Sequence, residues 1–472
     1  MAKRRPIMVM GCTSDAGKSF LVTALCRHAS NRGLRVAPFK GQNMSNNAAV
    51  TSDGGEIGRA QWLQARAARV DPDVRMNPVL LKPTSETWSQ VILLGRVDEA
   101  AGARPWLERR ELLWPAVRGA LQALLDEYDL VVIEGAGSPA EINLRATECV
   151  NFAVAKACGA DVYIAVDIDR GGAYAHLLGT FMALEPDERA LVKGFVLNRF
   201  RGDPALLLDA PRWLEERTGV PIVAVVPFVR HVLPEEDAFV DHPTTSAADV
   251  RLALVLYPYA SNLDEWDPLR FEPGVSVVPI RARRRLDGFE AILLPGSKNT
   301  AASLSHLVKS GLAEEIRAAA AAGVRVLGVC GGAQILGRSI HDPDGVESDT
   351  RTAEALGLVD IETTFRRPKT VRRTRLVLDG GATLETYEIH HGEVAPGPAA
   401  RATLAGGLGW AGGAVEGVLV HDLPRNTAWR QRFLESLGWR GRATDFDRRL
   451  DDELDRVAAL VDASGLAKAV GL

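Results

Sequence analysis

The sequence predicts an α/β protein whose first half folds as a doubly wound parallel sheet. Short runs of Val, Ile and Leu alternate with helical patterns through residues 7–226. Such runs are typical of strands that helices cover on both faces. A glycine-rich turn at 11–19 follows the first run, and a second glycine turn surrounds Cys330 after the apolar run 324–327. Turns that lead from a strand into a helix expose backbone N–H groups, so both turns are candidate sites for chemistry.

Helical patterns separate most of the strands expected in the first half. After Ser19, the apolar residues Leu21, Ala24 and Leu25 share one helical face, and Gly33 provides a stop. The expected strands lie at 7–10, 35–39, 91–94, 130–133, 162–168, 194–197 and 222–226.

A polar stretch between Pro234 and Asp249 predicts a domain boundary. We expect a first domain at 1–235, a linker at 236–250, a second α/β domain at 251–445 and a helical tail at 446–472. In the second domain we expect strands at 252–256, 275–280, 291–294 and 324–329, a helix at 301–322 and β-rich sequence at 382–420. In the tail, an apolar stripe indicates a helix that packs back on the body; it consists of Leu450, Leu454, Val457 and Val461.

Composition argues against several classes of protein. The chain has 472 residues, 46% of them hydrophobic, and a formal net charge of −4, which disfavours a general nucleic-acid or membrane-surface binder. No apolar run reaches the ~18 residues that span a bilayer, and the basic start leads into a strand rather than a signal peptide. The five cysteines form no CxxC pair, as expected for free thiols in a reducing compartment. We therefore expect a cytoplasmic protein without membrane or nucleic-acid partners.

The first glycine turn has the character of a phosphate-binding loop. It reads Gly11-Cys12-Thr13-Ser14-Asp15-Ala16-Gly17-Lys18-Ser19 and is one residue longer than GxxxxGK[ST]. Its N–H groups would face the phosphates of ATP, Lys18 would reach the β and γ oxygens, and Ser19 would ligate Mg²⁺. The alternative is a structural turn, but the position after the first strand favours nucleotide binding. Partition-type ATPases carry an extra lysine where this chain has Thr13, which weakens that reading.

Two residues at the ends of later strands fit the same site. Glu134 follows the apolar run 130–133, where a carboxylate beside the loop would bind Mg²⁺. Its alternative is an ordinary acidic residue at a strand end. Lys40 follows the strand 35–39 and could neutralise a transferring phosphoryl group. From spacing alone, an exposed structural lysine explains Lys40 nearly as well.

The second glycine turn predicts a cysteine nucleophile. Gly328 and Gly332 flank Cys330 at two residues on either side, as in the nucleophile turn of hydrolases. The helix start after Cys330 favours the thiolate. The N–H of Gly331 would serve as an oxyanion donor, with a second donor at Gly296. An inert buried cysteine is the alternative, which the two glycines disfavour.

The thiolate needs a histidine partner, and three candidates exist. His421 follows the apolar run 418–420 and is the first choice, with His390 and His391 as rivals. Spacing does not separate them. A Cys-His pair suits glutamine amide hydrolysis, and a nucleotide site suits activation of a carboxylate as an acyl phosphate. Together they indicate a glutamine-dependent amide synthetase.

At this point the chain resembles the cobyric acid synthases, the glutamine-hydrolysing amidotransferases of cobalamin biosynthesis. The resemblance extends from the first strand to the tail helix. The matching stretches are 13–19, 37–40, 42–47, 56–61, 76–83, 141–144, 167–172, 294–300 and the Cys330 turn.

The resemblance implies a dethiobiotin-synthetase-like N-terminal domain and a class I glutamine-amidotransferase-like C-terminal domain. It implies ATP- and L-glutamine-dependent amidation of the b, d, e and g carboxylates of adenosylcobyrinic acid a,c-diamide. The nucleophile of the family falls on Cys330 and its histidine on His421. The family lacks the glutamate of the usual Cys-His-Glu triad, and position 423 here is Leu. Asn198 resembles the adenine-contacting asparagine of related synthetases.

A polyanionic corrinoid needs a basic pocket, and four cationic residues lie in or beside the matching stretches: Arg59, Lys82, Arg145 and Arg170. For each of the four, a solvated position on the surface explains the residue as well as a substrate contact does. One departure concerns Asp422, because the family usually has Gly after its histidine. Two other functions stay open. One is the related a,c-diamide synthase, but the stretches 42–47 and 56–61 match the cobyric acid synthases and so argue against it. The other is a regulatory P-loop ATPase, and the intact Cys330 turn argues against that.

Overall fold

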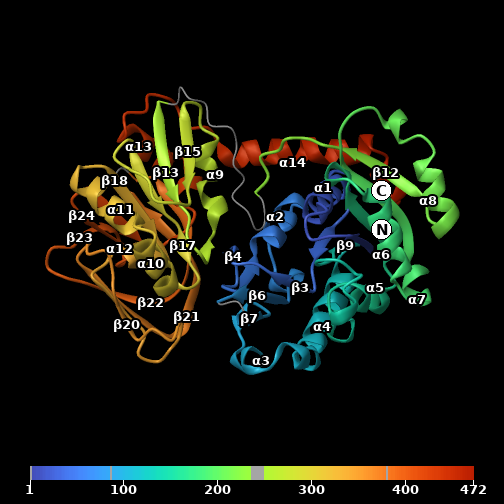
Figure 1. Ribbon diagram of the computed structural model, residues 1–472, viewed down its shortest axis with the longest axis horizontal. Coiled ribbons are helices and arrows are strands. Elements are labelled where there is room, and N and C mark those ends of the chain that lie inside the picture. The colour runs from blue at the N-terminus through green and yellow to red at the C-terminus, as the bar shows by residue number, and fades with distance from the viewer. Residues whose placement is uncertain (1–2, 85–87, 235–248, 379–380) are drawn as a thin grey trace.

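A computed structural model describes residues 3–84, 88–234, 249–378 and 381–472. The protein consists of two α/β lobes that lie side by side (Figure 1). The predicted linker, 236–250, lies almost entirely outside the described residues; β13 already begins at Val250. Within the described residues, no helix has the length and apolar character needed to cross a membrane.

The first lobe is built on a six-stranded sheet in the order β12-β11-β10-β1-β9-β2. All neighbouring strands are parallel, which confirms the predicted parallel sheet. Its strands are β1 (Ile7–Gly11), β2 (Val36–Phe39), β9 (Leu130–Glu134), β10 (Asp161–Asp167), β11 (Val192–Phe200) and β12 (Ile222–Pro227). The main helices of the lobe are α1 (Lys18–Asn31), α2 (Arg59–Ala67), α4 (Arg110–Glu127), α6 (Ala173–Met182) and α8 (Ala210–Thr218).

The expected strand at 91–94 lies outside this sheet. Its residues belong to β7 (Ser89–Leu93), which pairs antiparallel with β6 (Val79–Pro83). These strands join β3 (Gln42–Met44) and β8 (Arg96–Val97) in a separate four-stranded sheet. A short apolar run predicts a strand but does not determine which sheet it joins.

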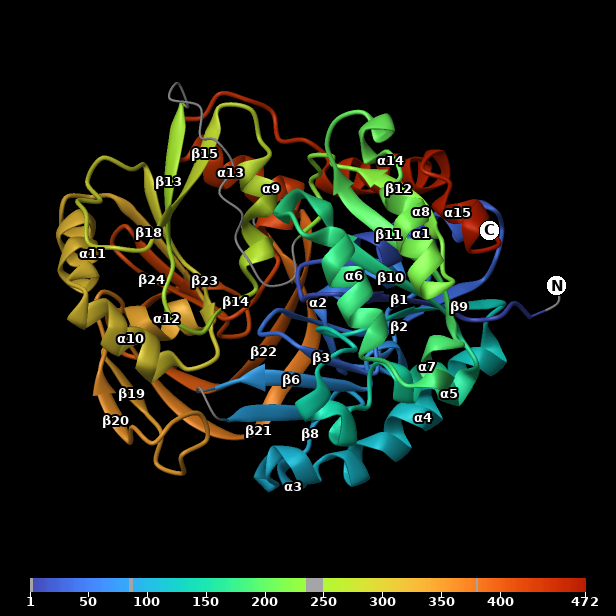
Figure 2. The ribbon, with the colours of Figure 1, turned by 45° about the vertical axis from the view of Figure 1, so that its right-hand side comes forward.

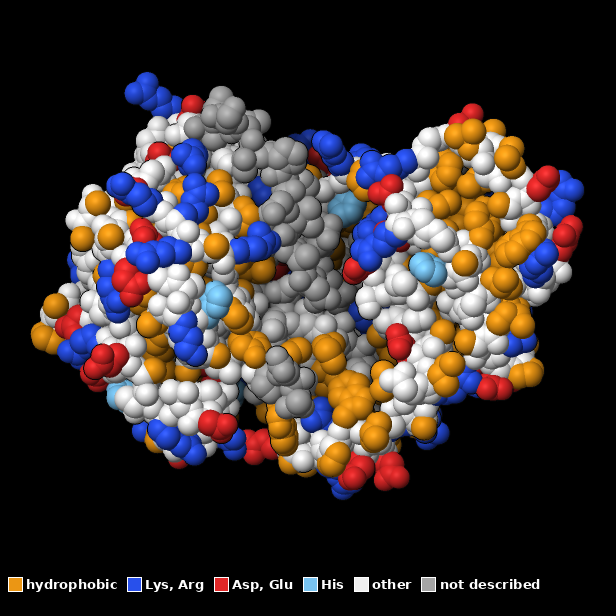
Figure 3. All heavy atoms as spheres, in the orientation of Figure 1, with side chains coloured by type: hydrophobic (Ala, Val, Ile, Leu, Met, Phe, Trp, Pro, Cys, Tyr) orange, Lys and Arg blue, Asp and Glu red, His pale blue; other side chains and the backbone are white. Residues whose placement is uncertain are grey.

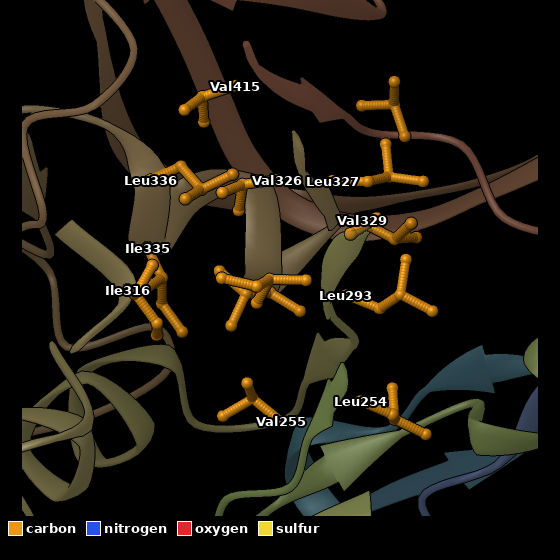
Figure 4. Packing of buried hydrophobic residues seen from close by; sticks show 14 of the residues in the cluster. Leu254, Val255, Leu293, Ile316, Val326, Leu327, Val329, Ile335, Leu336 and Val415 are labelled. Atoms are coloured by element: carbon orange, nitrogen blue, oxygen red, sulfur yellow. The ribbon is translucent and has the colours of Figure 1, made fainter. Parts of the chain in front are cut away.

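The second lobe has a seven-stranded sheet in the order β15-β13-β16-β18-β25-β24-β23. The strands from β15 to β25 are parallel, and the last two are antiparallel. The bounds are β13 (Val250–Val255), β15 (Val275–Ile280), β16 (Ala291–Leu294), β18 (Arg325–Val329), β23 (Arg401–Leu404), β24 (Gly409–Gly412) and β25 (Val415–Val418). Figure 4 shows how Leu254, Leu293 and Leu327 from neighbouring strands pack in its core.

The helix expected at 301–322 is two helices, α10 (Thr300–Lys309) and α11 (Leu312–Ala321). Gly311 separates them with a φ of 75°, a left-handed conformation that glycine adopts without strain. The apolar pattern continues across the break, which is why periodicity alone suggested one helix.

The tail returns to the first lobe. Helix α14 (Phe446–Ala463) packs on α1, and its predicted stripe of Leu450, Leu454, Val457 and Val461 is fully buried there. In Figure 1, α14 (red) runs along the top of the first lobe. The chain therefore crosses between the lobes twice, and the first lobe contains both ends of the described chain.

A long hairpin of the second lobe forms much of the contact with the first. Strands β21 (Ile361–Val377) and β22 (Thr383–Pro396) lie against β4 (Ala48–Val50). In Figure 2 the hairpin (orange) passes beside β6 of the first lobe. Tyr387 and Ile389 of β22 form one buried apolar cluster with Ala48, Val50, Leu80 and Ile92 of the first lobe. Burial of apolar side chains from both lobes fixes their relative position.

Two candidate active sites

The phosphate loop connects β1 to α1 at the carboxyl end of the sheet. Lys18 folds back over it, and its Nζ donates to the carbonyls of Thr13 at 3.0 Å, Ser14 at 3.0 Å and Gly137 at 3.1 Å. Gly17 has a φ of 85°, and a Cβ there would lie 2.1 Å from Nδ2 of Asn198. Only glycine fits at this position.

Asn198, the expected adenine contact, braces this loop. It is 2% exposed, and its Nδ2 donates to the Ala16 carbonyl at 2.9 Å. This contact holds the loop on β11. The role of Asn198 toward adenine stays a prediction.

Two of the predicted loop-site residues, Ser19 and Lys40, meet at a third, Glu134. Its Oε1 accepts from the Ser19 hydroxyl at 2.9 Å and from Lys40 Nζ at 2.8 Å, and Gln64 donates to Oε2. Burial alone would raise the pKa of Glu134, but the charge of Lys40 and the hydrogen bonds from Lys40, Gln64 and Ser19 together outweigh it and hold the pKa below its usual value. Glu134 is therefore a buried carboxylate that stays ionised.

Two cavities share Ser14, Lys18 and Ser19 in their walls. The larger, about 440 Å³, is lined by Lys40, Glu134 and Arg145 among others. The smaller, about 160 Å³, is lined by Phe20, Arg199 and His231, with the Phe20 and His231 rings stacked at 5.1 Å. The loop therefore lies between two separate binding spaces.

The four cationic candidates for the substrate lie in different places. Arg145 lines the larger cavity and pairs with Glu185 at 2.5 Å. Arg170 is more than half exposed and pairs with Asp15 at 2.8 Å. Arg59 and Lys82 lie outside this cavity, in buried ion pairs at the contact between the lobes. A substrate contact stays a prediction for all four residues, each of which is paired with a carboxylate in the structure.

The Cys330 turn has the tight geometry that its glycines predicted. Cys330 connects β18 to α12 (Gly331–Leu336) with a φ of 51° and a ψ of −109°. A non-glycine residue in this region is strained and is held by its surroundings. Its N–H donates to the Val418 carbonyl at 2.7 Å. A Cβ at Gly332 would lie 2.2 Å from the Leu294 carbonyl oxygen, so no side chain fits there.

Of the three candidate histidines, His421 makes the hydrogen bond with the Cys330 side chain. His421 follows β25, its N–H donates to the Tyr387 carbonyl at 2.8 Å, and its ring stacks on Tyr387 at 5.2 Å. His390 and His391 line the same pocket but bond elsewhere. His390 Nδ1 lies 2.9 Å from the Gly392 carbonyl, and His391 Nε2 lies 3.2 Å from Gln90.

A carboxylate that the sequence analysis missed faces His421. Nδ1 of His421 lies 3.2 Å and 3.4 Å from the two oxygens of Glu265. Burial acts to lower the pKa of His421, but the Glu265 charge and the Cys330 hydrogen bond outweigh it and raise the pKa to about 10. Glu265 lies in the turn Leu263–Trp266, and it is 156 residues from His421 in the sequence. No motif marks it, so spacing could not have found it.

The pocket at Cys330 encloses about 30 Å³ and carries charges of both signs. Lys298 and Glu347 of the second lobe and Lys82 of the first line it. Burial lowers the pKa of Lys298 and raises that of Glu347 to about 7. The two predicted oxyanion glycines lie close by. A Cβ on Gly331 would meet Ser297 N at 2.6 Å, and one on Gly296 would meet His421 Cε1 at 3.2 Å.

Comparison with known proteins assigns both lobes. Residues 7–238 match the model for a CobQ/CobB/MinD/ParA nucleotide binding domain, and residues 251–427 match a CobB/CobQ-like glutamine amidotransferase domain. A cobyric acid synthase of Deinococcus radiodurans is 51% identical, over 97% of this chain and 98% of its own. One of Acidovorax ebreus is 50% identical, over 90% of this chain and 92% of its own. The chain belongs to the cobyric acid synthase family.

It is therefore an enzyme with a nucleotide-binding lobe and a glutamine-amidotransferase lobe. Among solved structures, one described as a crystal structure of glutamine amidotransferase resembles 40% of this chain and 99% of its own, at 17% identity. Its TM-score of 0.33 is too low to add to the argument.

Asp422, where the resemblance implies Gly, binds an arginine of the first lobe. Asp422 accepts from Arg59 Nη2 at 3.1 Å, and Arg59 Nε also binds Asp264 at 2.5 Å. Asp422 adopts a φ of 65°, the left-handed region that favours Gly and tolerates Asp. Asp422 thus forms an ion pair between the lobes directly beside His421.

An amide row, defined as Asn46, Asn43, Gln61 and Gln64, borders the two sites; Asn46 is half-buried and the other three are buried. Asn46 lines the Cys330 pocket, Asn43 lines the larger nucleotide-side cavity, and Gln64 contacts Glu134. Asn43 donates to Gln61 at 3.0 Å. Within the described residues, Oδ1 of Asn46, Nε2 of Gln61 and Oε1 of Gln64 have no hydrogen-bond partner. Unpaired buried polar atoms are costly and call for a functional explanation.

Proposed function

We propose that this enzyme amidates the b, d, e and g carboxylates of adenosylcobyrinic acid a,c-diamide, using ATP and the amide nitrogen of L-glutamine. The observation that supports this most directly is the pairing of two sites in one chain. One combines a strained cysteine with a histidine, and the other gathers Lys18, Ser19, Lys40 and Glu134 at a phosphate loop. The first suits release of ammonia, and the second suits activation of a carboxylate.

In the glutaminase half, Cys330 Sγ attacks the amide carbon of glutamine. His421 gives its proton to the leaving nitrogen as the C–N bond breaks, which releases ammonia and leaves a thioester. Water then cleaves the thioester to glutamate, and its proton returns to His421. The N–H groups near Gly331 and Gly296 would receive the developing oxyanion. Lys298 and Glu347 suit the two charges of the amino acid.

In the synthetase half, a carboxylate oxygen of the corrinoid attacks the γ-phosphorus of ATP and ADP departs. Ammonia then displaces phosphate from the acyl phosphate and forms the carboxamide. We infer that the nucleoside occupies the cavity lined by Phe20 and His231, and the corrinoid carboxylate the larger one. Lys18 and Lys40 would stabilise the charge on the transferring phosphoryl group.

Mg²⁺ fits the donors at this site. The Ser19 hydroxyl and the Glu134 carboxylate are oxygen ligands of the kind that Mg²⁺ prefers. In the described part of the chain, no group of three or more His, Cys, Asp or Glu residues could hold a metal ion. Nucleotide phosphates and water would thus complete the coordination, as is usual for this ion. When bound, Mg²⁺ would neutralise phosphate charge.

We further propose that ammonia passes between the sites along the amide row. Ammonia donates three hydrogen bonds and accepts one. The unpaired oxygens of Asn46 and Gln64 would accept from it, and the unpaired Nε2 of Gln61 would donate to it. This role explains the matching stretches 42–47 and 56–61, which supply Asn43, Asn46 and Gln61.

Mass spectrometry tests the proposed reaction directly. The full chain is incubated with adenosylcobyrinic acid a,c-diamide, ATP, Mg²⁺ and glutamine. Each carboxylate converted to a carboxamide lowers the mass by about 1 Da, so four successive steps are expected. ATP hydrolysis without any mass change would show that the corrinoid is not the substrate.

A further inference from the structure

We propose that Glu265 is the positioning residue of the glutaminase, acting through His421 to hold the imidazole in line with Cys330. This inference rests on the glutaminase half of the proposed function. The usual triad glutamate would lie two residues after the histidine, where this chain has Leu423. The proposal places the third member of the site on a different turn, Leu263–Trp266, which is distant in the sequence but packs against the turn that contains Leu423.

The contacts of Glu265 are directed at His421 and its neighbour. Both carboxylate oxygens face Nδ1 of His421, at 3.2 Å and 3.4 Å, and the backbone N–H of Asp422 donates to Oε2 at 3.3 Å. Glu265 and His421 are each 2% exposed. The pair is therefore shielded from water, where a charge-assisted hydrogen bond is strong and directional.

The surrounding charges leave Glu265 available to His421. Two further carboxylates, Asp264 and Asp422, lie on either side, and Arg59 of the first lobe binds both, at 2.5 Å and 3.1 Å. The Arg59 guanidinium thus binds both flanking acids, and Arg425 supplies a second cation 3.9 Å from Asp422. The imidazole of His421 is the cationic partner that faces Glu265 itself.

This geometry determines which nitrogen of His421 does the chemistry. A carboxylate accepts hydrogen bonds, so Nδ1 carries a proton and donates to Glu265. Nε2 is then the nitrogen left for the Cys330 side chain and for the ammonia that leaves glutamine. Without the carboxylate, the ring could take the opposite tautomer or rotate, and both changes remove the proton donor from the reacting atoms.

A purely structural role for Glu265 predicts something different, and a matched variant separates the two. Glu272 is also 2% exposed in the same lobe, but it binds Arg430 at 2.7 Å and the backbone of Thr444 at 3.0 Å. Glu272→Gln therefore removes a buried carboxylate without touching His421. Glu265→Gln keeps the size and shape of the side chain and removes the charge.

The test measures glutamate release by the full chain as a function of pH, with ammonium-driven amidation as a check of folding. Glu265→Gln should lower kcat for glutamine hydrolysis by about 10²–10⁴-fold, change KM by less than about threefold, and shift the pH profile. Ammonium-driven amidation should stay within about twofold of the wild type. Glu265→Asp should recover part of kcat, and Glu272→Gln should keep the wild-type pH profile.

Two results would overturn the proposal. One is a Glu265→Gln variant that hydrolyses glutamine at nearly the wild-type rate with an unchanged pH profile. The other is an equal loss of kcat in Glu272→Gln. If the wild type releases glutamate but does not amidate the corrinoid, the proposed substrate is wrong. Glutamate release by the Glu265 variants would still decide whether Glu265 positions His421.

Discussion

Cys330 carries the most specific chemical prediction at the scale of single residues. Its positive φ and the glycines around it place the buried Sγ at the start of α12, beside His421. Cys330→Ala should lower glutamine-dependent amidation by at least about 10³-fold, because no other group can form the thioester. Amidation with ammonium salts should persist.

Cys158→Ala is the matched control, because this thiol lies on α5 (Phe152–Cys158), is only partly buried and lines neither pocket. It should retain both activities. Loss of ammonium-driven amidation in Cys330→Ala would instead mean that the residue supports the synthetase site.

The ion pair of His421 with Glu265 predicts how its stabilising effect depends on pH. The pKa of His421 is raised to about 10, above the roughly 6.5 of an unfolded histidine. Its stabilisation is therefore complete below pH ~6.5 and is lost as the pH rises through about 10. The melting-temperature gap between the wild type and His421→Asn should be largest near pH ~6 and should shrink toward pH ~10. A gap that is constant over this range would contradict the pairing.

Residue types in sequence motifs could be predicted, but their partners could not. The glycine turns identified Cys330 and Lys18, and strand ends identified Lys40 and Glu134, which the structure brings within hydrogen-bond distance of each other. Glu265 escaped detection because its contact with His421 exists only after two distant segments fold together. Charge and position in the matching stretches made Arg59 and Lys82 substrate candidates, but neither property shows which carboxylates these cations meet at the contact between the lobes.

At the scale of elements, the phosphate loop should be separable from the glutaminase. Lys18→Ala removes the cation that lies on the loop carbonyls. We expect roughly a 10²–10³-fold loss of amidation with either nitrogen source, because transition-state charge on the phosphoryl group is no longer stabilised. Glutamate release should remain measurable. An equal loss of glutamate release would show that the second site depends on the loop.

Helix α14 should stabilise the first lobe although the second lobe precedes it in the chain. Leu454 is fully buried against α1, so Leu454→Ala should cost about 2–5 kcal/mol. The neighbouring exposed Asp452→Ala should change little. Thermal unfolding of the full chain measures both. Equal melting temperatures for the two variants would mean that the helix contributes no packing energy.

Periodicity predicted the elements better than their assembly. The parallel strands of both lobes and the tail stripe follow from apolar runs and helical spacing, since burial imposes those patterns. The break at Gly311 and the placement of β7 in a small separate sheet did not follow. In both cases the deciding factor was the backbone conformation or the pairing partner, which apolar pattern does not encode.

At the scale of the whole molecule, both lobes contribute residues to the pocket at Cys330 and to the surroundings of His421. Lys82 and Asn46 of the first lobe line the Cys330 pocket, and Arg59 reaches the acids beside His421. Figure 3 shows acidic and basic side chains intermingled over the visible face rather than in one large patch of either sign. Buried ion pairs, by contrast, gather at the contact between the lobes.

The contact between the lobes also predicts how glutamine hydrolysis can be uncoupled from amidation. Gly58 ends β5 (Glu56–Gly58) at the centre of the amide row. A Cβ there would lie 2.8 Å from Gln61 Oε1, 2.9 Å from Asn43 Nδ2 and 2.9 Å from Asn77 Oδ1. Its φ of −58° and ψ of 139° suit any residue, so a larger side chain would not strain the backbone but would clash with these amide groups and displace them.

Gly58→Val should therefore block ammonia while leaving both chemistries in place. Glutamate release and ammonium-driven amidation should continue, but glutamine-driven amidation should fall by about tenfold or more, because displaced amides close the route. Free ammonia should then accumulate in solution in step with glutamate. The matched control is Gly119→Val. Gly119 is an exposed residue of α4, and a Cβ there meets nothing within 4 Å. If Gly58→Val still forms glutamate and carboxamide in equal amounts, ammonia takes another route between the lobes.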